Sequence, residues 1–216
     1  MGIAMIFSTS CSNEETKTEN KHEEHVENHQ EDKKETCLYS VDKESLRINW
    51  TAFKHTAKAP VGGVFDMVEL NHVTPAEKIS DVFKNATVSI YTHSVNSNNE
   101  GRDEKIKTSF FDTMEKTTII TGAIKSIEGG EDDGTAVISI TMNDVEKDID
   151  FDWKTMEDRT GLLLKGEINV GDFNATPSLD ALHEVCAEKH TGEDGKSVLW
   201  PEVQINIKVA LNKECK

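Results

Sequence analysis

Apolar and polar side chains alternate with a period of two from Leu46 to Ala52, the pattern of a strand with one buried face. Seven further strand-like runs follow along the chain, at residues 61–70, 86–93, 117–127, 135–142, 147–153, 162–170 and 203–211. Gly129-Gly130 and Asp133-Gly134 have the turn chemistry of a hairpin. The pattern predicts an all-β domain of about eight antiparallel strands, closed into a barrel because closure removes exposed strand edges.

Two short helices are expected between these strands. The segment 74–77 combines a threonine suited to the N-cap, a proline for the first helical position and a glutamate three residues after the cap. Pro177 opens the second helix, in which Leu179, Leu182 and Cys186 share one face. Within the strand at 61–70, the pair Gly62-Gly63 indicates a bend or a bulge.

The first 36 residues read as an export signal followed by a tether. Residues 2–7 are apolar and Ser8-Thr9-Ser10 leads into Cys11, as small residues precede the acylated cysteine of a bacterial lipoprotein. We expect residues 1–11 to be a remnant lipoprotein signal and Cys11 to be the site of lipid attachment. Residues 12–36 hold one branched aliphatic side chain, Val26, so we expect a disordered acidic tether. The signal and the tether together predict an outer-membrane lipoprotein of the cell envelope, facing the periplasm or the surface.

Charge and length narrow the class of protein further. The chain has 216 residues, with 40 Asp and Glu against 24 Lys and Arg, for a formal net charge of −16. Nucleic acid is therefore not an expected partner, because phosphate binding requires a basic face. No apolar run approaches the roughly 18 residues that a membrane-spanning helix needs. Residues 37–216 have the length of a single domain.

Four cysteines are present, and none forms a C-x-x-C pair of the kind found in zinc ribbons and thioredoxin-like proteins. In an antiparallel meander barrel, the first and last strands pair, so the start of one lies beside the end of the other. Cys37 opens the first strand and Cys215 closes the last, which predicts a Cys37–Cys215 disulfide. Cys186, on the second helix, could replace either partner, and three free thiols are the remaining alternative.

The order of elements over residues 88–124 carries a family resemblance. A strand-like run is followed by polar turn residues, then by Arg102-Asp103 and Phe110-Phe111-Asp112 at the two ends of a helix-like segment, and then by a second strand. This matches the R-D-x-x-[LI]-x-[ST]-x-x-F-F-[DN] element of the YceI-like family of lipocalin-shaped, lipid-binding barrels. Residues 50–54 (WTAFK), 61–66 (VGGVFD) and 163–170 (LLKGEINV) resemble further strands of that family. The resemblance covers residues 39–211, and residues 171–202 depart from the family's pattern after the late strand.

The resemblance implies a lipocalin-like barrel whose interior binds an apolar chain, such as a polyisoprenoid, a quinone tail or a fatty amide. A membrane-anchored carrier or sequestering lipoprotein is the implied role, with no cofactor other than such a bound chain and with a homodimer as one assembly. Arg102, Asp103 and Asp112 are expected to hold the helix-like segment in place. Nine inward side chains are candidates either for the ligand contact or for ordinary core packing: Trp50, Phe65, Val88, Ile90, Ile119, Ile138, Ile140, Phe151 and Trp153.

Two alternative functions rest on polar clusters. Asp148, Asp150 and Asp152 alternate along one strand, so they would share a face that could hold a hard cation, serve acid–base chemistry, or simply meet solvent. We favour the solvated face and expect no enzyme, because no catalytic motif accompanies the three carboxylates. A metal-handling or scaffold protein with a filled barrel is the other alternative. A metal-handling protein would use His190, Glu193 and Asp194 together with the N-terminal histidines His22, His25 and His29. We predict no metal site at these residues.

Overall fold

The computed structural model describes residues 36–116 and 118–216. The predicted signal at 1–11, the lipid attachment site Cys11 and all but the last residue of the tether at 12–36 lie outside these residues. None of the helices in the described part is both long and apolar enough to cross a membrane.

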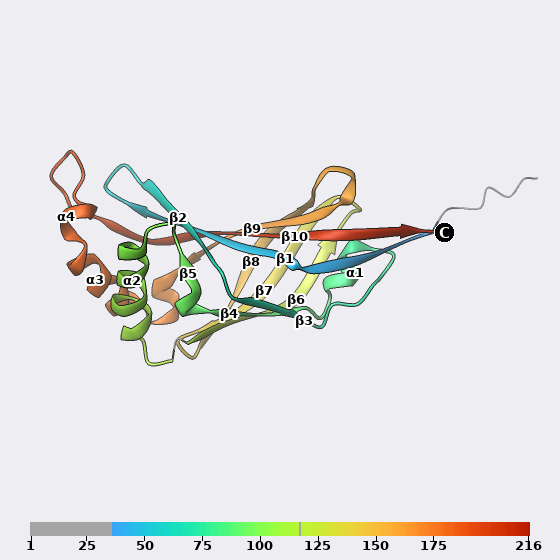
Figure 1. The fold of residues 1–216 in the computed structure, drawn as a ribbon, viewed down its shortest axis with the longest axis horizontal. Helices are drawn as coiled ribbons and strands as arrows, with labels where there is room; N and C mark the ends of the chain where they lie inside the picture. Colours follow the sequence, from blue (N-terminus) through green and yellow to red (C-terminus); the bar gives the residue numbers. More distant parts are fainter. Residues whose placement is uncertain (1–35, 117) are drawn as a thin grey trace, which may run out of the picture. The chain divides into compact units, whose positions relative to one another are not determined.

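The described residues form an all-β domain with short helices, as the alternation predicts. Ten strands join one antiparallel sheet in the order β3-β4-β6-β7-β8-β9-β10-β1-β2-β5. The sheet curls around a common interior, so β1 and β10 lie side by side with β9 next to them (Figure 1). The strands are β1 Cys37–Lys54, β2 Ala59–Phe65, β3 Val68–Asn71, β4 Thr87–Tyr91, β5 Val95–Asn96, β6 Ile119–Gly129, β7 Asp133–Met142, β8 Val145–Thr155, β9 Gly161–Asn169 and β10 Leu199–Cys215.

The two strands beyond the predicted eight arise from two interruptions. The run expected at 61–70 breaks at Asp66-Met67 into β2 and β3, and a 3-10 turn, η1 (Thr92–Ser94), separates β4 from β5. Backbone hydrogen bonds continue across both breaks, from Asp66 N to the Ser94 carbonyl (3.0 Å) and from Tyr91 N to the Met67 carbonyl (3.1 Å). These bonds lie between the β2–β5 pair and the β3–β4 pair, and so connect β3 and β5, the two end strands of the sheet order. The interrupted strands therefore still act as one hairpin of an eight-strand meander.

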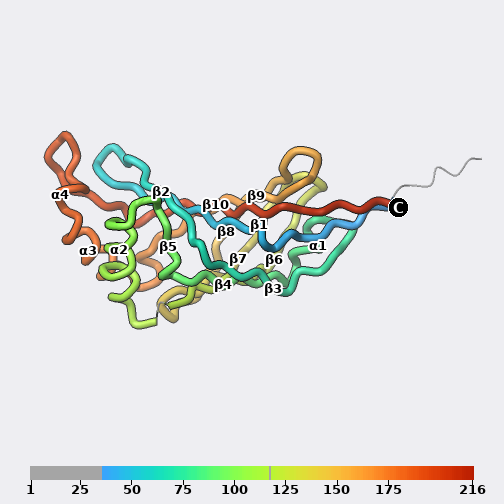
Figure 2. Tube along the Cα trace, viewed as in Figure 1, coloured from blue at the N-terminus to red at the C-terminus, as the bar shows by residue number. Residues whose placement is uncertain are grey.

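The first and last strands pair along most of their length. β1 and β10 run side by side (Figure 2) and antiparallel, with Cys37 opposite Cys215. These two cysteines form a disulfide. The predicted pairing is thus confirmed, and Cys186 is the free thiol among the described cysteines. On its other edge β1 pairs with β2 only over residues 49–54, and its first half meets the chain at an isolated bridge between Tyr39 and Ala76. The sheet is therefore a curled half-barrel that is looser along this seam.

Within the described residues, four helices accompany the sheet: α1 Ile79–Phe83, α2 Glu100–Ser109, α3 Thr176–Val185 and α4 Ala187–His190. Further 3-10 turns are η2 Phe111–Thr113, η3 Glu157–Arg159 and η4 Val170–Phe173. In the ribbon, α2, α3 and α4 gather at one end of the strands, and α1 lies toward the end where β1 begins and β10 ends (Figure 1). The two ends of the sheet are therefore covered by different helices.

One predicted helix start is wrong and the other is confirmed. α3 contains Pro177 in its first turn, as expected. α1 begins only at Ile79, after an extended Lys78 (φ −107°, ψ 135°), and not at residues 74–77. The backbone of Ala76 instead exchanges two hydrogen bonds with Tyr39 (2.8 and 3.1 Å). Pairing with β1 thus overrides a sequence that would otherwise cap a helix.

The interior is filled from alternate positions of the strands. On β8, Phe151 and Trp153 are each 2% exposed, whereas the intervening Asp150 and Asp152 face solvent. Burying one such large apolar side chain stabilises the fold by roughly 1.5–3 kcal/mol. The period of two that predicts the strand therefore also determines which of its side chains form the core.

Candidate ligand-binding cavity

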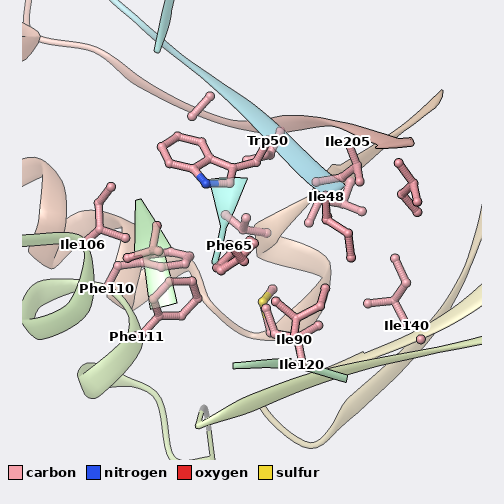
Figure 3. Close-up of a pocket in the computed structure, with 18 of the residues that line it drawn as sticks. Ile48, Trp50, Phe65, Ile90, Ile106, Phe110, Phe111, Ile120, Ile140 and Ile205 are labelled. Atoms are coloured by element: carbon pink, nitrogen blue, oxygen red, sulfur yellow. The ribbon is translucent and has the colours of Figure 1, made fainter. Parts of the chain in front are cut away.

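The interior of the sheet contains a cavity of about 180 Å³ at the end covered by α2 and α3. Its walls are almost wholly apolar: Thr121 has the only hydroxyl group among the lining side chains, and none of them is titratable. Figure 3 shows labelled side chains pointing into this space, with Phe110 and Phe111 on one side and Ile140 on the other. The lining residues comprise Ile48, Trp50, Ala52, Phe65, Val88, Ile90, Val95, Ile106, Phe110, Phe111, Ile120, Thr121, Gly122, Ile138, Ile140, Met142, Phe151, Ile168, Val170, Leu179, Leu182, Leu199, Trp200, Val203, Ile205 and Ile207.

Strand alternation positions most of these side chains. On β1, Ile48, Trp50 and Ala52 line the cavity, and the residues between them do not. β10 contributes in the same way through Val203, Ile205 and Ile207. Because successive side chains of a strand point to opposite faces, every second residue reaches the interior. The side chains that reach the cavity from these two strands are therefore all apolar.

Trp50 occupies its place because its neighbour has no side chain. Gly63 on β2 pairs directly with Trp50, and a Cβ at Gly63 would lie 2.5 Å from the indole Cζ2 and 2.6 Å from the Asn96 carbonyl oxygen. The pairing of β1 with β2 is regular through Gly62 and Gly63, so the predicted bend or bulge is absent there. The glycine instead provides the space that the indole fills.

The helical end of the cavity is closed by side chains from α2, η2 and α3. Phe110 and Phe111 pack edge to face with ring centroids 5.1 Å apart, and Phe111 lies 6.2 Å from Phe65. Leu179 and Leu182, one turn apart on α3, complete this cover. None of these residues was among the predicted lining residues, although the Phe-Phe pair and the shared face of Leu179 and Leu182 were the available signals.

A second, smaller cavity of about 60 Å³ continues the space toward the α1 end. It is lined by Leu46, Phe83 and Leu162, among others. The two cavities share lining residues, namely Ile48, Val88, Gly122, Ile138 and Ile207. The interior space is thus wide beneath α2 and α3 and tapers toward α1, which suits an elongated apolar group.

Seven of the nine candidate residues line the larger cavity: Trp50, Phe65, Val88, Ile90, Ile138, Ile140 and Phe151. Ile119 does not, because it is 41% exposed and the next residue, Ile120, takes the inward position. Trp153 is buried but lies away from both cavities, where its indole nitrogen donates to the Glu128 carbonyl (2.9 Å). Trp153 is therefore a core residue near the β6–β7 turn.

Arg102 and Asp103 brace the start of α2 through a shared partner. The guanidinium of Arg102 donates to the hydroxyl and carbonyl oxygens of Ser97, each at 2.7 Å. The buried carboxylate of Asp103 accepts from the backbone N–H of Ser97 (2.9 Å) and from its hydroxyl. Asp112 bonds His93 on the other side of the segment (2.6 Å). All three predicted positions thus hold the helix in place and lie outside the cavity lining.

The polar clusters behind the alternative functions do not converge. Asp148, Asp150 and Asp152 are exposed on the outer face of β8, and Asp148 pairs with Lys125 (3.3 Å). Within residues 36–116 and 118–216, no three His, Cys, Asp or Glu side chains are grouped closely enough to hold a metal ion. His190 is therefore not brought together with Glu193 and Asp194 as a ligand set.

Comparison with known proteins agrees with this geometry. The model of the YceI-like domain matches residues 39–211. A polyisoprenoid binding domain from Saccharophagus degradans, implicated in plant cell wall breakdown, is similar in structure with a TM-score of 0.56 at 16% identity, over 82% of this chain and 98% of that one. No curated protein matches the chain.

Two further solved structures share the fold. BcnA of Burkholderia cenocepacia has a TM-score of 0.56 at 13% identity, over 80% of this chain and 99% of that one. The YceI protein of Campylobacter jejuni has a TM-score of 0.51 at 24% identity, over 75% of this chain and 90% of that one. With the matched domain spanning nearly all of the described residues, the chain belongs to the YceI-like family.

Proposed function

We propose that this protein binds one apolar chain, such as a polyisoprenoid, a quinone tail or a fatty amide, inside the barrel, and acts as a carrier or sequestering protein without catalysis. The observation that carries the proposal is the cavity itself, whose lining is apolar and contains no titratable side chain. An enzyme would need at least one group able to transfer a proton or attack a substrate. A binding protein for hydrocarbon needs neither.

Hydrocarbon burial supplies enough free energy for such binding. Removing a methylene group from water is favourable by roughly 0.8 kcal/mol, so a buried stretch of about eight methylene groups contributes roughly 6 kcal/mol before the cost of ordering the chain. The tapered interior, with its second cavity reaching toward Phe83, gives a linear chain more wall to contact than a compact ligand would have. A relative with this fold is itself described as a polyisoprenoid binding domain.

The proposal includes an envelope location and an anchor. The Cys37–Cys215 disulfide fits a compartment outside the cytoplasm, because cysteine thiols stay reduced in the cytoplasm. Acylation at Cys11 would tether the domain to the outer membrane as a lipoprotein. Intact-mass analysis of membrane-extracted protein tests this: a diacyl or triacyl increase that disappears in Cys11→Ser supports the anchor, and an unmodified mass contradicts it. Sedimentation analysis of the same protein tests the proposed homodimer.

Adjacent isoleucines on β6 provide a matched test of cavity binding. Ile120→Trp would fill the cavity, whereas Ile119→Trp places the same bulk on the exposed face one residue away. We expect Ile120→Trp to weaken the binding of a fluorescent long-chain probe by roughly tenfold or more, because overpacking removes the space for the chain. Ile119→Trp should bind as the original protein does. Equal binding by both variants would contradict the cavity as the site.

A further inference from the structure

Five basic side chains gather around the α2–α3 end of the cavity, although the chain as a whole carries a net charge of −16. His190 at the end of α4 is buried, and its ring packs edge to face against that of His183, with centroids 5.3 Å apart. Lys54 Nζ and His55 Nε2 both bond the carbonyl of the preceding residue, Lys189 (3.0 and 3.1 Å), and Lys105 Nζ bonds the Val185 carbonyl. These side chains come from α3, from β1 and the turn after it, and from α2. We refer to His190 and these four neighbours as the basic cluster.

The helical members of the basic cluster adjoin the cavity through the chain. Lys105 directly precedes Ile106, and His183 directly follows Leu182. Both Ile106 and Leu182 line the larger cavity. The same two helices that close the apolar space therefore carry basic residues next to cavity-lining residues in the sequence.

The members from β1 and its turn adjoin the cavity through pairing and hydrogen bonding. Lys54 lies opposite Leu199 in the β1–β10 pair, and the carbonyl of His55 accepts a hydrogen bond from the indole of Trp200 (2.8 Å). Leu199 and Trp200 both line the larger cavity. On the strand side, the basic cluster is thus linked to the cavity-lining residues Leu199 and Trp200 by pairing and by a hydrogen bond.

No carboxylate in the described part forms an ion pair with the lysines of this cluster. Lys54 Nζ donates to the Lys189 carbonyl and Lys105 Nζ to the Val185 carbonyl, each at 3.0 Å. Asp194 lies near His55, and its carboxylate also accepts from the Thr56 hydroxyl (2.8 Å). His55 thus has a carboxylate nearby, whereas the two lysines have no ion-paired carboxylate among the described residues.

His190 adds an unused hydrogen-bonding group. It is 8% exposed, and its Nδ1 atom is buried without a hydrogen-bond partner. Burial, and after it the neighbouring basic groups, lower the pKa of His190 from 6.5 to about 4, so its ring is neutral at pH 7. A buried polar atom left unpaired is costly, and a ligand atom that bonds to it would remove that cost.

We propose that the apolar chain bound in the cavity carries an anionic head group, a carboxylate or a phosphate, and that the basic cluster holds this head beside α2 and α3. The inference rests on the proposed function, because it assigns an orientation to a chain inside the cavity. The tail points toward α1, where the space narrows to the smaller cavity beside Phe83. The head remains at the wide end, where charge-assisted hydrogen bonds to the lysines stabilise it.

Ligands with one tail and different heads test this assignment. Hexadecanoate, hexadecyl phosphate and uncharged hexadecanamide are titrated into the delipidated full-length protein at pH 7. We expect at least one of the two anions to bind roughly tenfold more tightly than the amide, an advantage that decreases with added salt. Comparing the two anions identifies the preferred head. Inorganic phosphate alone should bind far more weakly than either anion, because it lacks the tail.

Two double variants with the same change in net charge distinguish an effect of the basic cluster from an effect of the protein's net charge. Lys54→Gln with Lys105→Gln removes two positive charges and keeps donors for the Lys189 and Val185 carbonyls. Lys125→Gln with Lys208→Gln makes the same change on exposed positions of β6 and β10. The cluster variant should lose the preference for the anions and bind the amide as before, and the control should retain it.

The outcomes distinguish the two proposals. Binding of all three ligands with equal affinity would overturn the assignment of an anionic head and leave cavity binding intact. An unchanged preference in the cluster variant would also overturn it. Failure of all three ligands to bind would contradict the proposed function itself.

Discussion

Gly63 is the residue whose lack of a side chain shapes the cavity wall most directly. Trp50 fills the space above it, and the wall at this point is an indole ring whose nitrogen is directed to the Val64 carbonyl (3.4 Å). A larger residue at 63 would push the ring into the cavity or separate β1 from β2. The identity of one small residue on β2 thus determines the position of one large residue on β1.

Gly63→Ala should therefore destabilise the domain and weaken ligand binding together. The added methyl group would overlap Trp50 and the Asn96 carbonyl, and overpacking of this kind costs about 1–3 kcal/mol. Urea unfolding measures the loss. Gly101→Ala is the matched control, because its Cβ would meet only the Asn99 side chain at 3.7 Å, and it should be neutral or stabilising by up to about 1 kcal/mol. Equal effects of the two changes would refute the steric account.

His190 makes the stability of the domain depend on pH. Its pKa is about 4 in the folded state and ordinarily 6.5, so the unfolded chain binds more protons between these values. The free energy of unfolding should therefore fall as the pH decreases from 6.5 to about 4. Below pH 4, protonation of His190 should cause no further change. Urea unfolding at pH 7.5 and pH 4.5 should show a smaller loss for His190→Gln than for the original protein.

The control for that prediction is His72→Gln at an exposed histidine, which leaves His190 in place and should keep the original loss on acidification. If His190→Gln loses as much stability between the two pH values as the original protein, the ring of His190 is not the group responsible.

Side-chain orientation could be predicted where alternation is strict and not where two apolar residues are adjacent. Val88 and Ile90 flank Ser89, so the pattern fixes their shared face, and both line the cavity. Ile119 and Ile120 are consecutive, and the sequence gives no parity for the strand. The pairing of Ile119 with Tyr91 determines that Ile120 points inward, and that pairing is a tertiary fact.

At the scale of elements, the sequence predicts the strands more completely than it predicts where elements begin and end or which helices close the cavity. The strand runs were recognisable because period-two alternation is local, whereas the break at Asp66-Met67 leaves no such signal. The start of α1 was misplaced because Ala76 pairs with Tyr39, 37 positions earlier in the sequence. That Phe110, Phe111 and Leu182 cover the cavity depends on how α2 and α3 pack against the sheet, which no local pattern specifies.

The disulfide joins β1 and β10, the first and last strands of the domain, which pair with each other. It links positions 178 residues apart, so its removal frees the unfolded chain of a large constraint. Replacing both Cys37 and Cys215 by Ser should lower the free energy of unfolding by about 2–5 kcal/mol. Ligand affinity at 20 °C should be retained, because neither cysteine lines the cavity. Lost affinity in a variant that still shows a cooperative unfolding transition would indicate that the seam between β1 and β10 shapes the site.

At the scale of the whole molecule, the two ends of the barrel differ, and this difference would give a bound chain one orientation. The α1 end is closed by buried Ile79, Val82 and Phe83, and the disulfide lies at the ends of β1 and β10. The opposite end has the larger cavity, the helical cover and the basic cluster. An apolar interior with one polar border is the arrangement that a carrier of amphiphilic chains requires.

Native mass spectrometry of the full-length protein, purified from an oxidising compartment and then extracted with organic solvent, tests whether the barrel holds an apolar chain. We predict a bound species of one chain per protein, released by solvent, recovered with Ile119→Trp and absent with Ile120→Trp. A mass equal to the unliganded protein, unchanged after incubation with polyisoprenoids, quinones and fatty amides, would contradict apolar-chain binding.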